Sequence, residues 1–142
     1  MLTAEEALER LKKGNQRFVH GETNHQKLLT HQERAQMAES QAPFAIILGC
    51  SDSRVPAEMV FDQGLGDLFV IRVAGNIVAP SQVGSVEFAA DSFGCPLVVV
   101  LGHSHCGAIH STIEALQNPD QPPSANVMSI VNRVRPSVEI LM

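Results

Sequence analysis

Two apolar runs in this chain are each followed at once by a cluster of polar and sulfur-bearing side chains. Residues 44–49 (FAIILG) precede the sequence CSDSR at 50–54, and residues 97–102 (LVVVLG) precede HSHCG at 103–107. Runs of this length without alternating polar residues are typical of strands that are buried on both faces of a parallel sheet. The carboxyl ends of parallel strands lie at one edge of the sheet, where ligands bind. We therefore expect the two clusters to meet at that edge.

The rest of the chain alternates apolar runs with segments of helical spacing, a pattern that is typical of an α/β fold. We predict a central, mainly parallel sheet that is flanked by helices. The expected strands span residues 44–49, 68–73 and 97–101, and the expected helices span residues 3–18, 31–39, 56–60, 80–93, 107–116 and 124–135. Pro136 is expected to stop the last helix, because proline lacks an N–H group and its ring clashes with the preceding turn.

The N-terminal segment predicts an arm of two helices. Thr3 and Glu6 have the spacing of a capping box, in which each side chain bonds the backbone N–H of the other residue. Gly14 interrupts the first helix, so packing rather than helix propensity must support it. Neither helix has a broad apolar face, which suits an exposed arm or a contact with another subunit. A chain of 142 residues fits one domain, which we divide into a helical arm at residues 1–40 and an α/β core at residues 41–142 that carries both polar clusters.

The composition limits the binding partners and the cellular compartment that we expect for this protein. The formal net charge is −5 and no run of Lys or Arg offsets it, which argues against nucleic acid or an anionic membrane as a partner. No apolar stretch approaches the ~20 residues that span a bilayer, and the acidic N-terminus does not resemble a signal peptide. The three cysteines indicate metal or thiol chemistry rather than disulfides. We expect a cytoplasmic protein. The apolar residues 138–142 favour a chain that is cut short of a complete domain.

Cys50, His103 and Cys106 form a candidate zinc site. Zinc binds thiolate sulfur and imidazole nitrogen, and two cysteines with one histidine occur in catalytic sites that keep a fourth position open. His103 and Cys106 lie three residues apart at a strand-to-helix turn, and Cys50 follows the other strand. Taken singly, each residue is better explained by burial at a strand end or by capping of a helix. Their combination after two apolar strands favours zinc.

Asp52 and Arg54 follow the first candidate ligand at alternate positions. A carboxylate two residues from a metal thiolate can bind the metal as a fourth ligand, or it can accept a hydrogen bond from water on the metal. Arg54 can hold Asp52 away from the metal through a bidentate ion pair. An isolated Asp-x-Arg sequence is more commonly a surface ion pair in a loop. The adjacent Cys50 favours a chemical role here.

The sequence CSDSR at 50–54, with HSHCG at 103–107, closely resembles the two motifs of the beta class of carbonic anhydrases. The resemblance covers most of the chain. It implies a zinc enzyme that interconverts carbon dioxide and bicarbonate through a zinc-bound hydroxide, assembled as a homodimer or homotetramer on a parallel sheet. Asp52 and Arg54 are then the catalytic dyad, and Asp52 is a fourth ligand only in a closed state. The zinc ligands that the resemblance implies are Cys50, His103 and Cys106.

The same resemblance extends to four substrate-binding residues. Gln41 matches a glutamine whose amide contacts the substrate, although a role as a polar loop residue explains it equally well. Phe69 and Phe88 match apolar residues that line the substrate pocket, partly across the dimer interface, and ordinary core packing explains them at least as well. The backbone N–H of Gly107 at a helix N-terminus can stabilise the charge of bicarbonate.

The chain also departs from the family pattern. Ile47 stands where some bacterial members have the tryptophan of an inhibitory bicarbonate site, and Arg72 fits the arginine of that site, but the chain has no tyrosine. We therefore predict an unregulated member, with zinc open to water and Asp52 paired to Arg54. Complete members usually continue for several dozen residues and add a further strand and covering helices.

Two alternative functions remain open at this point. Relatives of the family act on carbonyl sulfide or carbon disulfide with the same kind of site, and competition kinetics distinguish those substrates from carbon dioxide. A zinc-stabilised interaction module without turnover predicts that Asp52 binds the metal at every pH. Arg54 argues against this module, because a permanently metal-bound Asp52 leaves the guanidinium without its partner.

Overall fold

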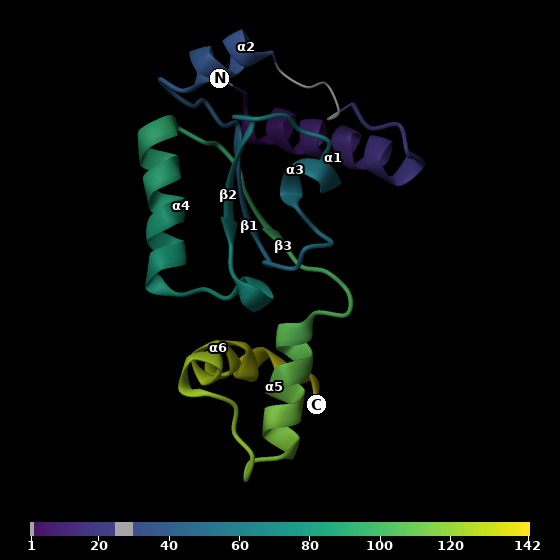
Figure 1. Ribbon diagram of the computed structural model, residues 1–142, viewed down its shortest axis with the longest axis vertical. Helices are drawn as coiled ribbons and strands as arrows, with labels where there is room; N and C mark the ends of the chain where they lie inside the picture. Colours follow the sequence, from purple (N-terminus) through teal and green to yellow (C-terminus); the bar gives the residue numbers. More distant parts are fainter. Residues whose placement is uncertain (1, 25–29) are drawn as a thin grey trace.

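The computed structural model describes residues 2–24 and 30–142, and it shows a sheet with helices on both faces (Figure 1). The sheet consists of β1 (Ala45–Gly49), β2 (Leu68–Arg72) and β3 (Val98–Leu101). The strand order is β2-β1-β3, and both pairs are parallel. The predicted α/β fold class is therefore confirmed.

The central strand β1 runs through the middle of the core. All five of its residues are buried, and its register places Ile47 beside Val70 of β2 and Val99 of β3. Side chains at alternate positions of a strand point to opposite faces of the sheet. Because helices cover both faces of β1, it is apolar at every position, as the sequence pattern predicts.

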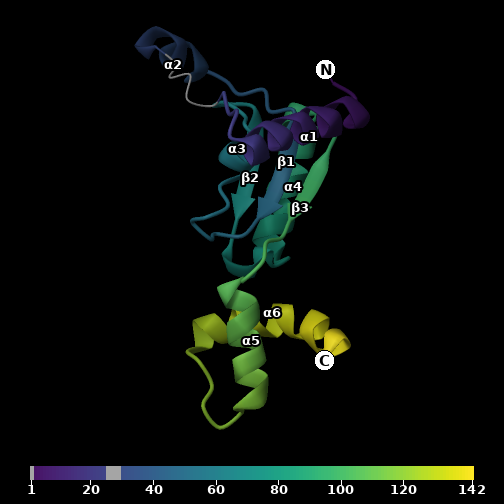
Figure 2. The ribbon, with the colours of Figure 1, turned by 90° about the vertical axis from the view of Figure 1, so that its right-hand side faces the viewer.

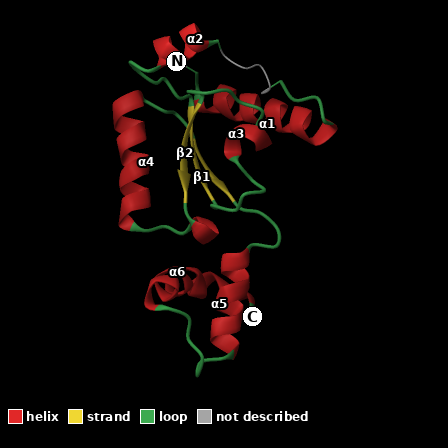
Figure 3. Cartoon of the chain, in the orientation of Figure 1, coloured by secondary structure: helices red, strands yellow, loops and turns green. Residues whose placement is uncertain are grey.

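The helix α4 (Pro80–Phe93) covers one face of the sheet (Figure 3). Proline at the first position favours the start of a helix. Gly94 ends the helix in the left-handed conformation with φ 63°, as the sequence predicts. The buried cluster on this face consists of Ile46, Leu48, Ile71, Ala89 and Cys95.

The helices α1 (Ala4–His20) and α3 (Ala57–Val60) cover the opposite face (Figure 2). The predicted capping box is confirmed, since Thr3 N–H donates to the Glu6 carboxylate at 2.8 Å and Glu6 N–H donates to the Thr3 hydroxyl at 3.2 Å. The narrow apolar face of α1 suggested an exposed arm, but Ala7 and Leu11 of this helix are buried against the sheet. The buried cluster on this face consists of Ala7, Leu11, Phe44, Ala45, Ile47, Ala57 and Leu68.

Gly14 marks the point where α1 approaches the segment after α3 most closely. A Cβ atom at this position would lie 1.7 Å from the carbonyl oxygen of Phe61. Next to it, the side-chain amide of Asn15 donates to the carbonyl of Val60 at 3.0 Å. The expectation that Gly14 interrupts the helix is wrong, because α1 continues through it to His20. The expectation that packing supports this helix is confirmed.

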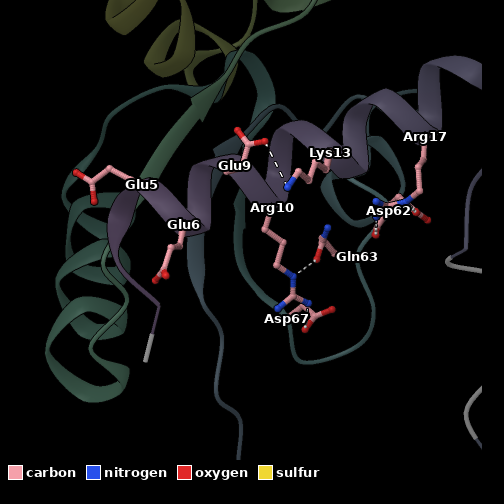
Figure 4. Close-up of a pocket in the computed structure, with 9 residues that line it drawn as sticks. All are labelled: Glu5, Glu6, Glu9, Arg10, Lys13, Arg17, Asp62, Gln63 and Asp67. Atoms are coloured by element: carbon pink, nitrogen blue, oxygen red, sulfur yellow. Dashed lines mark hydrogen bonds and ion pairs between the residues drawn. The ribbon is translucent and has the colours of Figure 1, made fainter.

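A charged cavity of about 690 Å³ lies between α1 and the loop before β2 (Figure 4). Arg10 forms an ion pair with Asp67 at 2.8 Å, and Arg17 forms one with Asp62 at 2.5 Å. These pairs tie α1 to the loop and offset much of the charge in the cavity. None of the site residues that the sequence predicts lines it.

The second helix of the predicted arm, α2 (His31–Met37), lies on the surface. It begins at a capping box of Thr30 and Glu33 and has no buried residue. In this respect α2 differs from α1, which contributes two residues to the core. The division of the chain into an arm and a core at residue 40 stays a prediction.

The helices α5 (Gly107–Gln117) and α6 (Ala125–Leu141) pack on each other beyond the carboxyl ends of the strands (Figure 1). The prediction that Pro136 stops the last helix is wrong, because α6 runs through it. Proline deprives the carbonyl of Asn132 of its helical N–H partner, but Val138, two residues after the proline, is buried and keeps the helix packed. Among the described helices, none is long and apolar enough to cross a membrane.

The strand β3 lies at an edge of the sheet and is only partly covered. Val98 and Val100 pair in register with Ile46 and Leu48, which places them on the face that α4 covers. Their exposed fractions are nevertheless 45% and 61%, because α4 packs over β1 and β2. Apolar surface is therefore exposed beside α4.

Candidate metal centre

Three potential metal ligands converge at the carboxyl edge of the sheet. Cys50 follows β1, His103 follows β3, and Cys106 is the N-cap of α5. One ligand atom from each residue lies within 4.8 Å of the other two, and the two sulfur atoms are 4.0 Å apart. Because β1 and β3 are neighbours in the sheet, residues far apart in sequence meet here. We call Cys50, His103 and Cys106 the three-ligand group.

The donor atoms of the three-ligand group fit a zinc ion. Thiolate sulfur and imidazole nitrogen are the ligands that zinc prefers in proteins. His103 Nε2 is buried and has no hydrogen-bond partner among the described residues. Its Nδ1 lies 2.9 Å from the carbonyl of Ser104, which assigns the ring proton to Nδ1 and leaves the Nε2 lone pair for a metal. A bound cation provides the partner that this buried nitrogen lacks.

The surroundings of Cys50 favour the thiolate, which is the form that binds metals. Burial raises the pKa of this thiol, but the neighbouring His103 ring and hydrogen bonds from backbone N–H groups outweigh burial and lower the pKa to about 7. In return, the Cys50 side chain raises the pKa of His103. Cys50 therefore ionises more readily than an ordinary cysteine thiol.

Sequence reasoning missed Gly75, whose N–H donates to Cys50 Sγ at 3.3 Å. Gly75 lies in the short turn η1 (Ala74–Asn76) after β2 and has a φ of 71°. A Cβ atom there would lie 3.0 Å from the Cβ of Ala108 on α5. Both the left-handed conformation and the close approach of α5 therefore require glycine. The available signal was a glycine just after the apolar run of β2.

Asp52 and Arg54 form a bidentate ion pair beside the three-ligand group. Arg54 Nε donates to Asp52 Oδ1 at 2.8 Å, and Arg54 Nη2 donates to Asp52 Oδ2 at 2.7 Å. Asp52 Oδ2 also lies 4.0 Å from His103 Nε2. The hydrogen bonds from Arg54 hold the pKa of Asp52 well below its usual range. Arg54 Nη2 also donates to the carbonyl of His105 at 3.1 Å, which links the two sequence clusters directly.

Replacement of Arg54 by methionine is expected to raise the pKa of Asp52 toward the ordinary value of about 3.9. In the native protein this pKa is depressed. A depressed pKa adds stability above the unfolded-state pKa, and this stability is lost as the pH falls through the folded-state pKa. A carbon-13 NMR titration of the Asp52 carboxyl group in metal-free protein measures the shift. An Asp52 pKa that stays low in Arg54→Met would show that another group keeps the carboxylate ionised. Arg133→Met is the control and is expected to leave the pKa of Asp52 unchanged, because Arg133 bonds to Ser129.

Of the four predicted substrate-binding residues, the structure brings Gly107 to the three-ligand group. It is the first residue of α5 and directly follows Cys106. Gln41 is exposed and precedes β1, whereas Cys50 follows that strand. The whole length of β1 therefore separates Gln41 from the group within this chain, and its substrate role stays a prediction.

The two predicted aromatic pocket residues lie in a cluster on the α4 face of the sheet. The ring centroid of Phe69 lies 6.2 Å from that of Phe88 and 6.0 Å from that of Phe93. Phe69 packs against the buried residues of that face, and Phe88 is 54% exposed. Core packing thus accounts for Phe69 within one chain, and the substrate roles of Phe69 and Phe88 stay predictions.

The sequence is similar to carbonic anhydrases. The sequence model of the carbonic anhydrase family matches residues 45–141. Carbonic anhydrase 2 of Mycobacterium tuberculosis is 47% identical over 129 residues, which cover 90% of this chain and 61% of that protein. The carbonic anhydrase of Mycolicibacterium smegmatis is 47% identical over 128 residues, with the same two coverages. The chain thus spans about three fifths of the length of these relatives.

Solved structures give the same result for the fold. The beta-carbonic anhydrase CcaA superimposes with a TM-score of 0.62 at 27% identity, over 90% of this chain and 61% of that chain. A Coccomyxa beta-carbonic anhydrase, solved in complex with acetazolamide, gives a TM-score of 0.65 at 25% identity, over 93% of this chain and 55% of that chain. The sequence match and the shared fold lead to one conclusion: the chain belongs to the beta-carbonic anhydrase family.

Proposed function

We propose that the protein is a zinc-dependent carbonic anhydrase that interconverts carbon dioxide and bicarbonate. Cys50, His103 and Cys106 are the proposed zinc ligands, and Asp52 and Arg54 are the proposed catalytic dyad. The observation that carries the proposal is the convergence of the three ligand atoms within 4.8 Å of one another. Further support comes from the names of the two mycobacterial relatives, which match 90% of this chain.

In the proposed reaction, the Asp52 carboxylate, the Arg54 guanidinium and the Gly107 N–H group orient and stabilise the reacting groups beside the metal position. Zinc, when bound, lowers the pKa of a water molecule that it coordinates to about 7 and so supplies a nucleophile at neutral pH. Asp52, which Arg54 keeps ionised, would accept a hydrogen bond from that water and would orient it toward carbon dioxide. Arg54 restrains Asp52 through two side-chain hydrogen bonds. The Gly107 N–H at the start of α5 stabilises the negative charge that develops on bicarbonate.

We also propose a cytoplasmic homodimer or homotetramer. The thiols of Cys50 and Cys106 must stay reduced to bind a metal, which a reducing compartment favours. Large apolar side chains at Phe88, Val98 and Val100 have exposed fractions of 54%, 45% and 61%. Exposed apolar surface of this kind supports a contact with another copy.

The Asp52→Asn variant tests the proposed function. An amide cannot carry the charge that Arg54 stabilises, and we expect the rate of carbon dioxide hydration to fall by roughly 100-fold or more. Stopped-flow hydration assays on the zinc-loaded, full-length protein measure the effect. Asp67→Asn is the matched control, because Asp67 pairs with Arg10 at the charged cavity. Undetectable hydration by the wild-type protein, or full activity of Asp52→Asn, would refute the proposal.

A further inference from the structure

Arg72, the last residue of β2, reaches across to the loop that follows β1. Its Nε donates to the carbonyl oxygen of Cys50 at 2.8 Å, and its Nη2 donates to the carbonyl oxygen of Asp52 at 2.5 Å. One guanidinium group therefore binds the main chain of both a zinc ligand and the proposed catalytic carboxylate. Neither the family resemblance nor the proposed mechanism gives Arg72 this role.

The main chain around the same loop has a complementary pattern of hydrogen bonds. Val73 N–H donates to the carbonyl of Gly49 at 3.2 Å, and Ser51 N–H donates to the carbonyl of Val73 at 3.2 Å. The backbone just after β2 thus holds residues 49 and 51, and the Arg72 side chain holds the carbonyls of residues 50 and 52. Together these bonds extend strand-like pairing beyond the end of β1, where a loop would otherwise be free to turn.

We propose that Arg72 is a positioning residue that fixes the Cys50 thiolate and the Asp52 carboxylate relative to each other. Fixing two alternate carbonyl groups fixes the intervening peptide planes, and with them the directions in which both side chains leave the backbone. The planar guanidinium group presents several donors in a rigid fork, whereas a lysine ammonium group is a single point charge on a flexible stem. The part of this inference that concerns Asp52 rests on the proposed function, whereas the part that concerns Cys50 does not.

The test compares Arg72→Met with Arg72→Lys in the full-length protein. Methionine removes both donors while it keeps much of the length of the side chain. Substitution of groups that orient metal ligands typically lowers metal affinity about 10- to 100-fold, and we expect a loss of this size in Arg72→Met. Arg72→Lys is expected to recover only part of the affinity, because one ammonium group does not reproduce the fork. Zinc affinity is measured by competition with a chromophoric chelator, at a temperature where all variants retain native circular dichroism.

Cobalt substitution separates a positioning role from a general loss of stability. Thiolate-to-cobalt and d–d absorption bands report the coordination geometry, and we expect them to shift in Arg72→Met. Arg133→Met is the matched control, because Arg133 bonds only to Ser129 of its own helix among the contacts described. Wild-type zinc affinity with unchanged cobalt bands in Arg72→Met would overturn the proposal. Full recovery of both by Arg72→Lys would overturn the requirement for a two-donor fork.

These readouts also separate this inference from the proposed function. Zinc affinity and cobalt absorption require no carbon dioxide, so they test Arg72 even if the wild-type protein does not hydrate it. If hydration occurs, Arg72→Met is expected to lower kcat beyond the loss that its zinc content explains, because Asp52 is also displaced. A kcat per bound zinc equal to that of the wild type would limit the role of Arg72 to the metal ligand.

Discussion

The Cys50→Ser variant is expected to lose stoichiometric zinc and, with it, hydration of carbon dioxide. A serine hydroxyl is a poor zinc ligand, since it does not ionise at neutral pH, whereas the pKa of Cys50 is already lowered to about 7. Loss of one of three protein ligands should weaken binding more than the roughly 100-fold that loss of an orienting group costs. Zinc content after dialysis and affinity by chelator competition measure the effect.

Cys95→Ser is the matched control for this substitution. Cys95 is also buried, but its thiol donates to the carbonyl of Pro43 at 3.1 Å rather than facing a metal position. A serine hydroxyl can make the same hydrogen bond, so we expect wild-type zinc content. Equal zinc content in Cys50→Ser and the wild type would contradict the assignment of Cys50 as a ligand.

The Gly14→Ala variant is expected to lower the free energy of unfolding by about 3 kcal/mol, at the upper end of the range for overpacking. The added Cβ would lie 1.7 Å from the Phe61 carbonyl oxygen, which is backbone and cannot rotate away. Either α1 or the segment after α3 must therefore move. Alanine favours a helix over glycine by about 1 kcal/mol, which offsets only part of the effect. Urea unfolding followed by circular dichroism measures the change.

Gly84→Ala is the control for helix propensity. Gly84 lies in α4, and a Cβ atom there would have no neighbour within 4 Å. We therefore expect Gly84→Ala to raise the free energy of unfolding by about 0.5–1 kcal/mol. A Gly14→Ala variant that is as stable as Gly84→Ala would show that α1 does not pack against the Phe61 carbonyl in solution.

Local sequence pattern predicts the sheet and the approach of the three ligands well. An apolar residue at every position of β1 agrees with its cover on both faces, whereas β3 is equally apolar but lies at an edge of the sheet with Val98 and Val100 exposed. Once β1 and β3 are parallel neighbours, residues that follow them must share an edge. The position of Cys50 near His103 and Cys106 thus follows from periodicity and topology alone.

The sequence pattern fails where a residue acts through a distant contact. By propensity, Gly14 and Pro136 are expected to break a helix. At position 14 the close approach of the Phe61 carbonyl leaves no room for a Cβ atom. Beyond Pro136, the buried Val138 keeps the helix packed. Gly75 and Arg72 act through hydrogen bonds to the loop of a neighbouring strand. No local spacing encodes such bonds, because they depend on the register between β1 and β2.

Zinc K-edge X-ray absorption of the full-length protein tests the metal centre most directly. The account predicts one zinc per chain with two sulfur scatterers at about 2.3 Å and nitrogen or oxygen scatterers at about 2.0–2.1 Å. The same spectrum of Cys50→Ser should show one sulfur or no bound zinc. A wild-type zinc with nitrogen and oxygen scatterers alone, or a protein that retains no zinc at neutral pH, would contradict the account.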